Sequence, residues 1–488
     1  MVGVAGKSKG CNTCRKRKIA CDQQKPVCVK CTRSKRVCGG YQRETVFVLS
    51  PSMSPQGIAG CTTTSSSAFV VRGSGKESTH SFTDTSTAYT LLNSHIERHN
   101  LVQAFLLNCF PSQPATSSHS WIPLLGELPT KGEALELSST AVAASAIGHM
   151  FHHRALVKLS LGYYTRALHQ LRQALRDPSL AREDGTLAAC MALSQYEALE
   201  CPNLGSEGYF NHCHGLIALV QARGCAVHSA GAGHWLFLGV RVPAILFALK
   251  HNHSTILFES SWMEQPWAGI SKTPHDRVTN CLAQAPLILE RVRSLFYLSI
   301  RQQIDLVHEL IRECWQIDEQ LEGIGNETQR STSDDLIYWQ FGHLFPVVFW
   351  FRDAQVAATL MLLWAARTML WSGLSNLYQH LECITPFLGP HSDQTSVLEV
   401  MKTGISYPLK SCGEYLSMAH RVCQSVEYSL KDETLLAGPL FVSPALGIVA
   451  DSLRNLPGHG HGLEIAWIQA ALEVVRRKGI RVLQHVKL

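Results

Sequence analysis

Apolar residues recur at steps of three and four along most of the chain after residue 87. In the clearest stretch, six follow one another at this spacing: Val157, Leu161, Tyr164, Leu168, Leu171 and Leu175. This is the period of one buried helix face. The pair Asp177-Pro178 comes directly afterwards, and a proline so close to the last periodic residue predicts the end of a helix. We therefore expect a helix over 157–175 with that face buried.

The same pattern continues to the end of the chain. We expect helices over 186–199 and over 207–222, the second closed by Gly224 as a C-cap. Similar apolar patterns predict further helices over 236–250, 282–318, 336–374, 397–429 and 463–485. No alternating run of apolar and polar residues bounded by hairpin signals occurs. Residues 87–488 are therefore predicted to form a large all-α domain.

A different composition precedes this helical region. Residues 50–86 are rich in Ser and Thr and lack heptads of apolar residues. Such a segment cannot bury enough apolar surface to offset the entropy of ordering its backbone. We therefore expect residues 44–86 to be a flexible linker between the helical domain and whatever comes before it.

Basic residues are concentrated at the start of the chain. Up to Glu44 there are twelve Lys and Arg against two acidic residues, a net charge of +10. Because the whole chain carries +6, the remainder carries −4. A basic head on a mildly acidic body is typical of a protein that binds a polyanion. Charge alone leaves nucleic acid and a membrane surface as alternatives.

The sequence contains little that favours a membrane. No apolar run opens the chain as a secretory signal would. The best candidate for a membrane span, residues 345–374, is interrupted by Arg352, Asp353 and Arg367, whereas about 18 consecutive apolar residues are needed. We therefore expect a reducing compartment and no membrane partner.

The seventeen cysteines are unevenly placed. Six lie between positions 11 and 38, spaced C-x2-C-x6-C-x6-C-x2-C-x6-C, and the other eleven are scattered. The six form an internal repeat of residues 11–21 and 28–38, with Lys18 and Lys35 at equivalent places. Clustered cysteines in a reducing compartment indicate a metal rather than disulfides. The scattered eleven are expected to be small buried residues.

Zinc chemistry explains the number of clustered cysteines. Structural zinc takes four ligands, usually Cys thiolates or His nitrogens, and the first histidine of the chain is His80. Six thiolates fill the eight positions of two ions only if two of them bridge, so a binuclear cluster is the economical solution. A segment of about 30 residues buries little core, so metal binding would supply most of its folding energy. A metallothionein-like or redox thiol cluster is the alternative, but it leaves the basic residues at matched positions unexplained.

Residues 11–38 resemble the fungal Zn2Cys6 binuclear cluster (C6 zinc finger) family, with all six cysteines at permitted spacings. The resemblance implies a DNA-binding domain over about 8–43 with two Zn²⁺ ions per chain. It also implies that Cys11 and Cys28 bridge the ions, and it assigns the other ligands in pairs: Cys14 and Cys21 to one zinc, Cys31 and Cys38 to the other.

Basic residues between the thiols suggest how this module would contact DNA. Four consecutive cations follow the second cysteine: Arg15, Lys16, Arg17 and Lys18. Phosphates would relieve their mutual repulsion and give salt-dependent affinity, but phosphates carry no sequence information. Lysine can donate to the guanine O6 and N7 acceptors in the major groove. By resemblance, Lys18 is the base reader at a CGG triplet with Arg17 beside it, and the others are phosphate contacts: Arg15, Lys16, Arg33, Lys35 and Arg36. The same cluster could double as a nuclear import signal.

The helical region carries a second, weaker resemblance. It contains Tyr164-x2-Ala167-Leu168-x2-Leu171-x2-Ala174-Leu175-x-Asp177, followed by His212-x2-Gly215 and Arg223-Gly224. These motifs resemble the fungal-specific transcription factor domain. The resemblance implies that residues 87–488 form a helical regulatory domain, one that could sense an effector and has no established catalysis.

We find no catalytic constellation in the helical region and predict that the chain is not an enzyme. His212 and His214 lie two positions apart on a predicted helix, so they point to different faces. His459 and His461 stand in a Gly-rich turn without an obvious carboxylate partner. No nucleophile elbow, zinc-protease helix or dinucleotide fingerprint occurs.

The sequence therefore predicts a nuclear, sequence-specific regulator of transcription by RNA polymerase II. Its partners would be CGG-containing promoter DNA and the transcription machinery. No coiled coil follows the cysteine cluster, so we expect monomeric binding or a homodimer formed through the helical body. Only the family base rate, and no residue here, points to a secondary-metabolite gene cluster as the target. Two alternatives stay open: an enzyme or a scaffold protein that uses the zinc module only for targeting.

Overall fold

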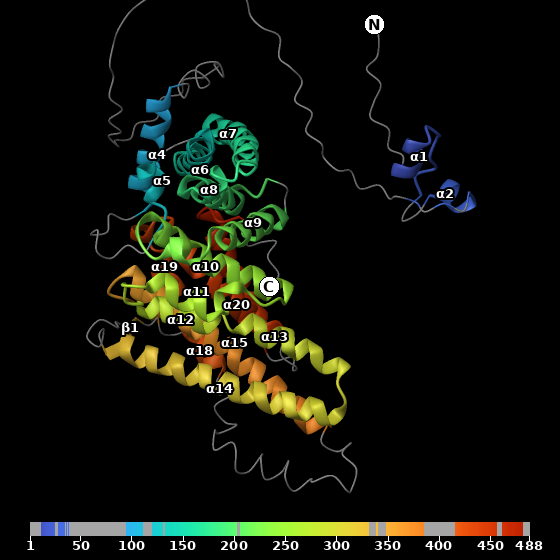
Figure 1. The fold of residues 1–488 in the computed structure, drawn as a ribbon, viewed down its shortest axis with the longest axis vertical. Helices are drawn as coiled ribbons and strands as arrows, with labels where there is room; N and C mark the ends of the chain where they lie inside the picture. Colours follow the sequence, from blue (N-terminus) through green and yellow to red (C-terminus); the bar gives the residue numbers. More distant parts are fainter. Residues whose placement is uncertain are drawn as a thin grey trace, which may run out of the picture. The chain divides into compact units, whose positions relative to one another are not determined.

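The computed structural model describes residues 11–24, 28–34, 36, 38, 94–110, 120–129, 132–202, 205–330, 338–339, 348–384, 415–455 and 461–481. The chain divides into two compact units, one within residues 1–80 and the other within residues 81–488 (Figure 1). The predicted linker over 44–86 lies outside the described residues. We refer to the two units as the cysteine module and the helical body.

The cysteine module contains two short helices, α1 (Asn12–Lys16) and α2 (Val29–Arg33). Each begins next to the first cysteine of its half of the repeat. Cys28 is the N-cap of α2, and its sulfur accepts a hydrogen bond from the backbone N–H of Cys31. A cysteine sulfur thus does here what a Ser or Asp oxygen does at an ordinary helix start.

The helical body is made of the following α-helices: α4 (His95–Cys109), α5 (Leu124–Glu127), α6 (Glu133–Met150), α7 (Arg154–Ala174), α8 (Asp184–Glu200), α9 (Glu207–Arg223), α10 (Gly231–His251), α11 (Ser260–Glu264), α12 (Pro274–Leu282), α13 (Ala285–Ser294), α14 (Ile300–Arg330), α15 (Ala354–Ile384), α18 (Tyr415–Gln424), α19 (Val426–Leu430), α20 (Ala437–Arg454) and α21 (Gly462–Arg477). Short 3-10 helices connect several of them: η1 (Leu180–Arg182), η2 (Cys225–His228), η3 (Ile256–Phe258), η4 (Gln265–Trp267), η5 (Leu295–Tyr297) and η7 (Asp432–Thr434). The all-α prediction is confirmed, apart from two-residue antiparallel strands, β1 (Tyr338–Trp339) and β2 (Val348–Phe349).

Two central helices organise the body. The Ala- and Ser-rich α6 is buried on nearly every side and packs against α4, α7 and α8. The long, apolar α15 packs in the same way against α14, α18 and α20. A helix that is apolar all round is a core helix, so each of these two helices is the axis of its own bundle. In Figure 1 the α6 bundle is blue to green and the α15 bundle yellow to red.

The chain returns from its C-terminal part to the first bundle. The backbone N–H of Leu436 donates to the carbonyl of Cys109 at 2.9 Å, and that of Arg481 donates to the carbonyl of Ala198 at 2.8 Å. Arg481 also donates to Glu200 at 3.1 Å. The core of the body is accordingly one continuous apolar cluster that includes residues from α4 to α21.

Several helix predictions are confirmed in position. The helices predicted over 157–175, 186–199, 207–222 and 236–250 correspond to α7, α8, α9 and α10. The helix predicted over 463–485 corresponds to α21 but is shorter than predicted, because α21 ends at Arg477 and residues 478–481 are not helical. Gly224 closes α9 as predicted, with φ of 81°, a left-handed value that glycine adopts without steric cost.

Two predicted ranges need correction, and a third is described only in part. The range 282–318 is not one helix, because α12 ends at Leu282 and α13 and α14 follow; Pro286 in the first turn of α13 cannot continue a preceding helix. The range 336–374 contains both strands, and α15 begins only at Ala354, after Asp353 accepts a hydrogen bond from the Val356 N–H at 2.8 Å. Residues 397–414 of the range 397–429 lie outside the described residues.

The predicted buried face of α7 is also partly wrong. Leu161 and Leu175 are 47% and 44% exposed. Ser160, Tyr163 and Ala167 are buried instead, whereas Tyr164 and Leu171 of the predicted face are buried as expected. The packing of α7 against α6 and α8 therefore buries a face that is shifted from the one that apolar spacing predicts.

One helix of the described chain is long and apolar enough to cross a membrane, judged by length and composition alone. It is α10, and half of its apolar window is buried within the body. The prediction that residues 345–374 are the best candidate for a membrane span is therefore wrong. α10 packs against α8, α9, α12 and α13, and its buried Arg241 pairs with the buried Asp276 at 3.0 Å. These contacts are those of a core helix.

Candidate metal centre and nucleic-acid interface

The six clustered cysteines converge in the cysteine module. Cys11, Cys14, Cys28 and Cys31 are fully buried, and the remaining two, Cys21 and Cys38, are half-buried. The sulfur of Cys28 lies 3.6 Å from that of Cys11 and 3.6 Å from that of Cys14. A tetrahedral zinc site with Zn–S bonds of about 2.3 Å separates its sulfurs by about 3.8 Å. The sulfurs are therefore spaced as ligands of a shared zinc ion would be.

The sulfurs fall into two sets of four, each with all members within 4.8 Å of one another. One set is Cys11, Cys14, Cys21 and Cys28; the other is Cys11, Cys28, Cys31 and Cys38. Cys11 and Cys28 belong to both sets. Two tetrahedral ions that share two ligands need this donor arrangement, so the residues present fit a binuclear zinc cluster.

Backbone hydrogen bonds repeat between the two halves of the module. The Cys14 N–H donates to the Cys11 sulfur at 3.4 Å, as the Cys31 N–H does to the Cys28 sulfur at 3.3 Å. After each helix, a backbone N–H returns to the carbonyl of the second cysteine: Ile19 to Cys14 at 3.1 Å and Arg36 to Cys31 at 3.0 Å. The internal repeat of the sequence is thus a repeat of structure, with the candidate bridging sulfurs each accepting an N–H bond.

Burial raises the pKa of the thiols of Cys11, Cys14, Cys28 and Cys31 above the usual value. Zinc binds thiolates, so binding would release protons and compete with this effect. The N–H bonds to sulfur and the surrounding Lys and Arg residues favour the thiolate form that the metal requires.

Lys18 occupies an unusual backbone position. Its φ is 53°, in the left-handed region that L-residues other than Gly, Asn and Asp seldom adopt. The bond from Ile19 N–H to the Cys14 carbonyl spans Lys18 and closes α1 in the manner of a Schellman motif. Glycine is the usual residue at this position. A lysine here costs about 1 kcal/mol, and its side chain is exposed just beyond the helix end.

The other candidate DNA contacts differ in their surroundings. Lys16, Arg33 and Arg36 are exposed. Arg17 is exposed too, but its guanidinium donates to the hydroxyl of Ser34 at 3.2 Å and so links the two halves. The side chain of Arg15, and Lys35 altogether, lie outside the described residues.

Sequence reasoning missed a positioning role for Asp22. One carboxylate oxygen accepts from the Gln24 N–H at 3.2 Å, and the other accepts from the Lys30 N–H at 3.0 Å. Asp22 thereby ties the segment after Cys21 to the start of α2. The sequence does contain a signal for this role, because Asp22 is the single acidic residue in a strongly basic segment.

The scattered cysteines and histidines of the body have ordinary packing positions. The described scattered cysteines are mostly buried, as predicted, but Cys225 is half-buried and Cys383 is exposed. Cys213 is buried in α9, and burial lowers the pKa of the neighbouring His212 to about 4. His461 lies 2.9 Å from the Tyr415 hydroxyl, and His459 lies outside the described residues. Among the described residues, only the two cysteine sets group three or more potential metal ligands.

Residues 9–45 match the fungal Zn(2)-Cys(6) binuclear cluster domain. The cysteine module is a Zn2Cys6 domain. It binds two zinc ions through its six cysteines, as predicted.

Similar proteins extend this finding. The chain is 42% identical over 64 residues to an uncharacterized transcriptional regulatory protein of Schizosaccharomyces pombe, a match that covers 10% of this chain and 12% of that protein. It is 64% identical over 33 residues to White-opaque regulator 2 of Candida albicans, 7% of each chain. It is 25% identical over 154 residues to the transcriptional regulatory protein moc3 of S. pombe, 28% of this chain and 30% of that one. The matches thus span less than a third of these relatives, and no solved structure matches the chain.

Proposed function

We propose that this protein is a nuclear, sequence-specific DNA-binding regulator of transcription by RNA polymerase II. The observation that carries the proposal is the Zn2Cys6 domain over residues 9–45, which presents basic side chains beside its two ligand sets. The names of similar proteins, which include transcriptional regulators, support it. In this proposal residues 8–43 bind DNA, 44–86 link the units, and 87–488 form the regulatory body.

In this proposal two of the six cysteines bind both zinc ions, and each of the other four binds one ion. Cys11 and Cys28 bridge the two ions, because they alone belong to both sulfur sets. The remaining ligands are divided by ion: Cys14 and Cys21 on one, Cys31 and Cys38 on the other. The backbone bonds to the two bridging sulfurs then fix the orientation of α1 and α2 on the cluster.

Lys18 is the proposed base reader. It stands past the end of α1 with an exposed side chain, and lysine is a donor suited to guanine O6 and N7. A CGG triplet is the target that the Zn2Cys6 resemblance implies. The left-handed backbone conformation of Lys18 costs stability that a glycine would not lose. Strained backbone positions of this kind are typical of functional sites.

The remaining basic residues are the proposed phosphate contacts. Lys16, Arg33 and Arg36 are exposed and can reach an anionic backbone, and such contacts give affinity that falls as salt rises. Arg15 and Lys35 complete the set. Arg17, bonded to Ser34, would both brace the module and contact DNA beside Lys18. The Arg15–Lys18 run also serves as the proposed nuclear import signal.

A competition gel shift with the full-length protein tests the assignment of Lys18. Lys18→Ala should keep two zinc ions and bind DNA, yet lose its preference for CGG over scrambled duplexes. Lys16→Ala is the matched control, and it should weaken binding to both duplexes equally and lower its salt dependence. Unchanged CGG preference in Lys18→Ala would refute the base-reading role.

Two alternatives predict different behaviour. A scaffold protein would bind zinc without measurable affinity for any duplex. An enzyme with a zinc targeting module would show turnover by the body. The DNA-binding proposal requires affinity for duplex DNA that depends on zinc.

The mode of binding and the target genes complete the proposal. The selected site would contain a single CGG triplet if the protein binds as a monomer. It would contain paired triplets at a fixed spacing if the helical body forms a homodimer. Control of a secondary-metabolite gene cluster rests on the resemblance alone, and transcript profiling after gene deletion tests it.

A further inference from the structure

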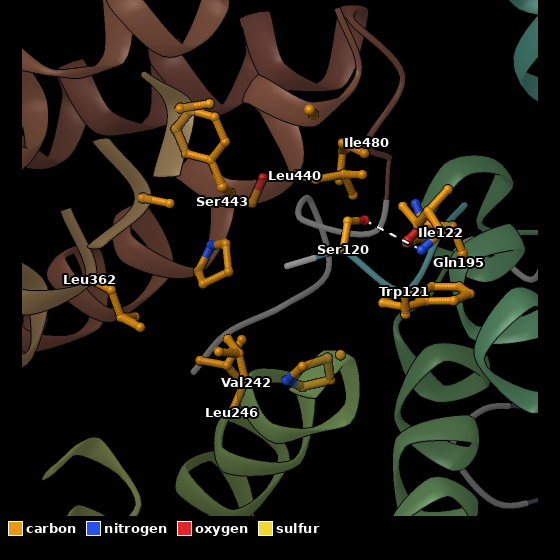
Figure 2. Close-up of a pocket in the computed structure, with 18 of the residues that line it drawn as sticks. Ser120, Trp121, Ile122, Gln195, Val242, Leu246, Leu362, Leu440, Ser443 and Ile480 are labelled. Atoms are coloured by element: carbon orange, nitrogen blue, oxygen red, sulfur yellow. Dashed lines mark hydrogen bonds between the residues drawn. The ribbon is translucent and has the colours of Figure 1, made fainter. Parts of the chain in front are cut away.

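A cavity of about 1440 Å³, partly open to solvent, lies in the helical body (Figure 2). Helices from both bundles line it, together with the segment just before α5. Figure 2 shows Val242 and Leu246 of α10 on one side and Leu440 and Ser443 of α20 on the opposite side. The cavity exceeds the volume of about 300–1,000 Å³ that is usual for small-molecule sites. It is therefore large enough for a ligand of ordinary drug or lipid size.

The wall of the cavity is mostly apolar. Leu246 of α10, Leu362 of α15, Leu440 of α20 and Ile480 after α21 all line it. These side chains come from segments far apart in the sequence, so the cavity depends on the packing of the whole body. A mostly apolar wall of this extent favours a mostly apolar occupant.

One polar group in the wall lacks a partner. The Nε2 atom of Gln195, on α8, is buried without a hydrogen-bond partner among the described residues, and Gln195 lines the cavity. In Figure 2 it lies near Ser120 and Ile122, at one end of the space. A buried amide N–H without a partner costs about 1–3 kcal/mol. An acceptor atom on a ligand would remove that cost.

Prolines within two lining helices provide acceptors in the same wall. Pro243 lies inside α10 and Pro444 inside α20, and both line the cavity. A proline has no N–H to bond the carbonyl four residues earlier. The carbonyls affected are those of Gly239 and Leu440, which also line the cavity. A ligand hydroxyl could therefore accept from Gln195 or donate to these carbonyls.

Four carboxylates line the wall: three have partners within the protein, and the fourth, Glu127, is exposed. Asp353 pairs with Arg352 at 3.2 Å, and Glu473 pairs with the neighbouring Arg476 and Arg477. Asp451 accepts from the Asn455 side-chain amide at 3.1 Å. The wall thus offers no buried ion that demands a counter-charge from a ligand.

We propose that this cavity binds an uncharged, mostly apolar small molecule whose oxygen accepts a hydrogen bond from Nε2 of Gln195. The inference concerns the helical body and is independent of how the Zn2Cys6 domain binds DNA. A molecule bound there would contact both the α6 and the α15 bundles at once. Its occupancy would therefore stabilise the body as a unit.

Dye binding to the full-length protein tests the site. Nile red, uncharged and apolar with a carbonyl oxygen, should bind saturably at one site per chain and raise the melting temperature of the body. Val242→Trp, which fills the cavity from α10, should lower its affinity at least tenfold. Val227→Trp is the matched control, because Val227 is 52% exposed and does not line the cavity; it should leave binding unchanged. No saturable binding, or equal binding by the wild type and Val242→Trp, would overturn the proposal.

A second probe isolates the hydrogen bond. Diphenylhexatriene is an apolar hydrocarbon without an acceptor atom. Gln195→Met keeps the length of the side chain and removes the donor, so Nile red affinity should fall about three- to tenfold, while diphenylhexatriene affinity stays the same or rises. Equal losses for both probes would show that Gln195 acts only through the shape of the wall. That result would refute the proposed hydrogen bond.

Discussion

The cysteine module and the helical body bury different kinds of side chain. In the module, the fully buried side chains are the thiols of Cys11, Cys14, Cys28 and Cys31. In the body, fully buried positions are hydrocarbon side chains such as Leu187, Phe237 and Leu360, drawn from helices far apart in the sequence. The ligands of the module all lie within 28 consecutive residues. A metal-centred interior can therefore be read from local spacing, whereas a hydrocarbon interior depends on distant contacts.

The largest expected effect is loss of a bridging ligand. Cys28→Ser should release both zinc ions and unfold the module, because structural zinc contributes about 10–16 kcal/mol to folding a small zinc domain. Native mass spectrometry would count the ions. Cys383→Ser, at an exposed cysteine of the body, is the control and should keep both. A Cys28→Ser protein that retained two ions would refute the bridging role.

A core substitution should act on the body alone. Leu360→Ala, at a fully buried position of α15, should lower the free energy of unfolding of the body by about 2–5 kcal/mol. Leu161→Ala, at a 47% exposed position, should change it by less than about 0.5 kcal/mol. Urea denaturation followed by helical circular dichroism measures both. If Leu360→Ala also reduced the zinc content, the two interiors would not be independent.

Acid should weaken the two units for different reasons. Burial lowers the pKa of His212 to about 4, below the ordinary value of about 6.5. The unfolded state therefore takes up a proton on this residue first as pH falls from about 6.5 to 4, and the body loses up to about 3 kcal/mol of stability in that range. His212→Gln should flatten that part of the pH profile of unfolding. In the module, acid instead competes with zinc for the thiolates.

An unchanged pH profile in His212→Gln would show that other groups govern the acid sensitivity of the body. Zinc content followed over the same pH range separates the two units, because His212→Gln should leave the release of zinc unaltered.

The smallest effect should be a gain in stability. Lys18→Gly places the preferred residue at the left-handed position, where φ is 53°, and should stabilise the module by about 1 kcal/mol. Competition with a chelator measures that gain, because zinc should be lost more slowly or only at a higher chelator concentration. The same variant should lose its preference for CGG. Lower zinc retention in Lys18→Gly would mean that the lysine side chain, rather than its backbone, supports the fold.

The sequence predicted the module well because its chemistry is local. The spacing of six cysteines and the absence of nearby histidine were enough to predict two zinc ions. The left-handed conformation of Lys18 and the ties made by Asp22 were not predicted, since both depend on backbone geometry. A lone acid among cations shows in the sequence as a charge, but the sequence does not show which backbone N–H groups it bonds.

The body was predicted in class but not in detail. Apolar spacing located α7, yet packing against α6 and α8 buries Ser160, Tyr163 and Ala167 and leaves Leu161 exposed. Apolar spacing predicts one helix over 282–318 because the period continues across Pro286, where the structure has a break. The cavity could not be predicted at all, because its wall is assembled from seven or more separate segments that no local pattern relates.

A binding-site selection with the full-length protein tests the central claim most directly. Random duplexes would be selected once with zinc and once with a chelator, and the zinc content of each sample would be measured. The account predicts enrichment of CGG-containing duplexes with zinc and none with the chelator. A protein that holds two zinc ions and still enriches no sequence would contradict it.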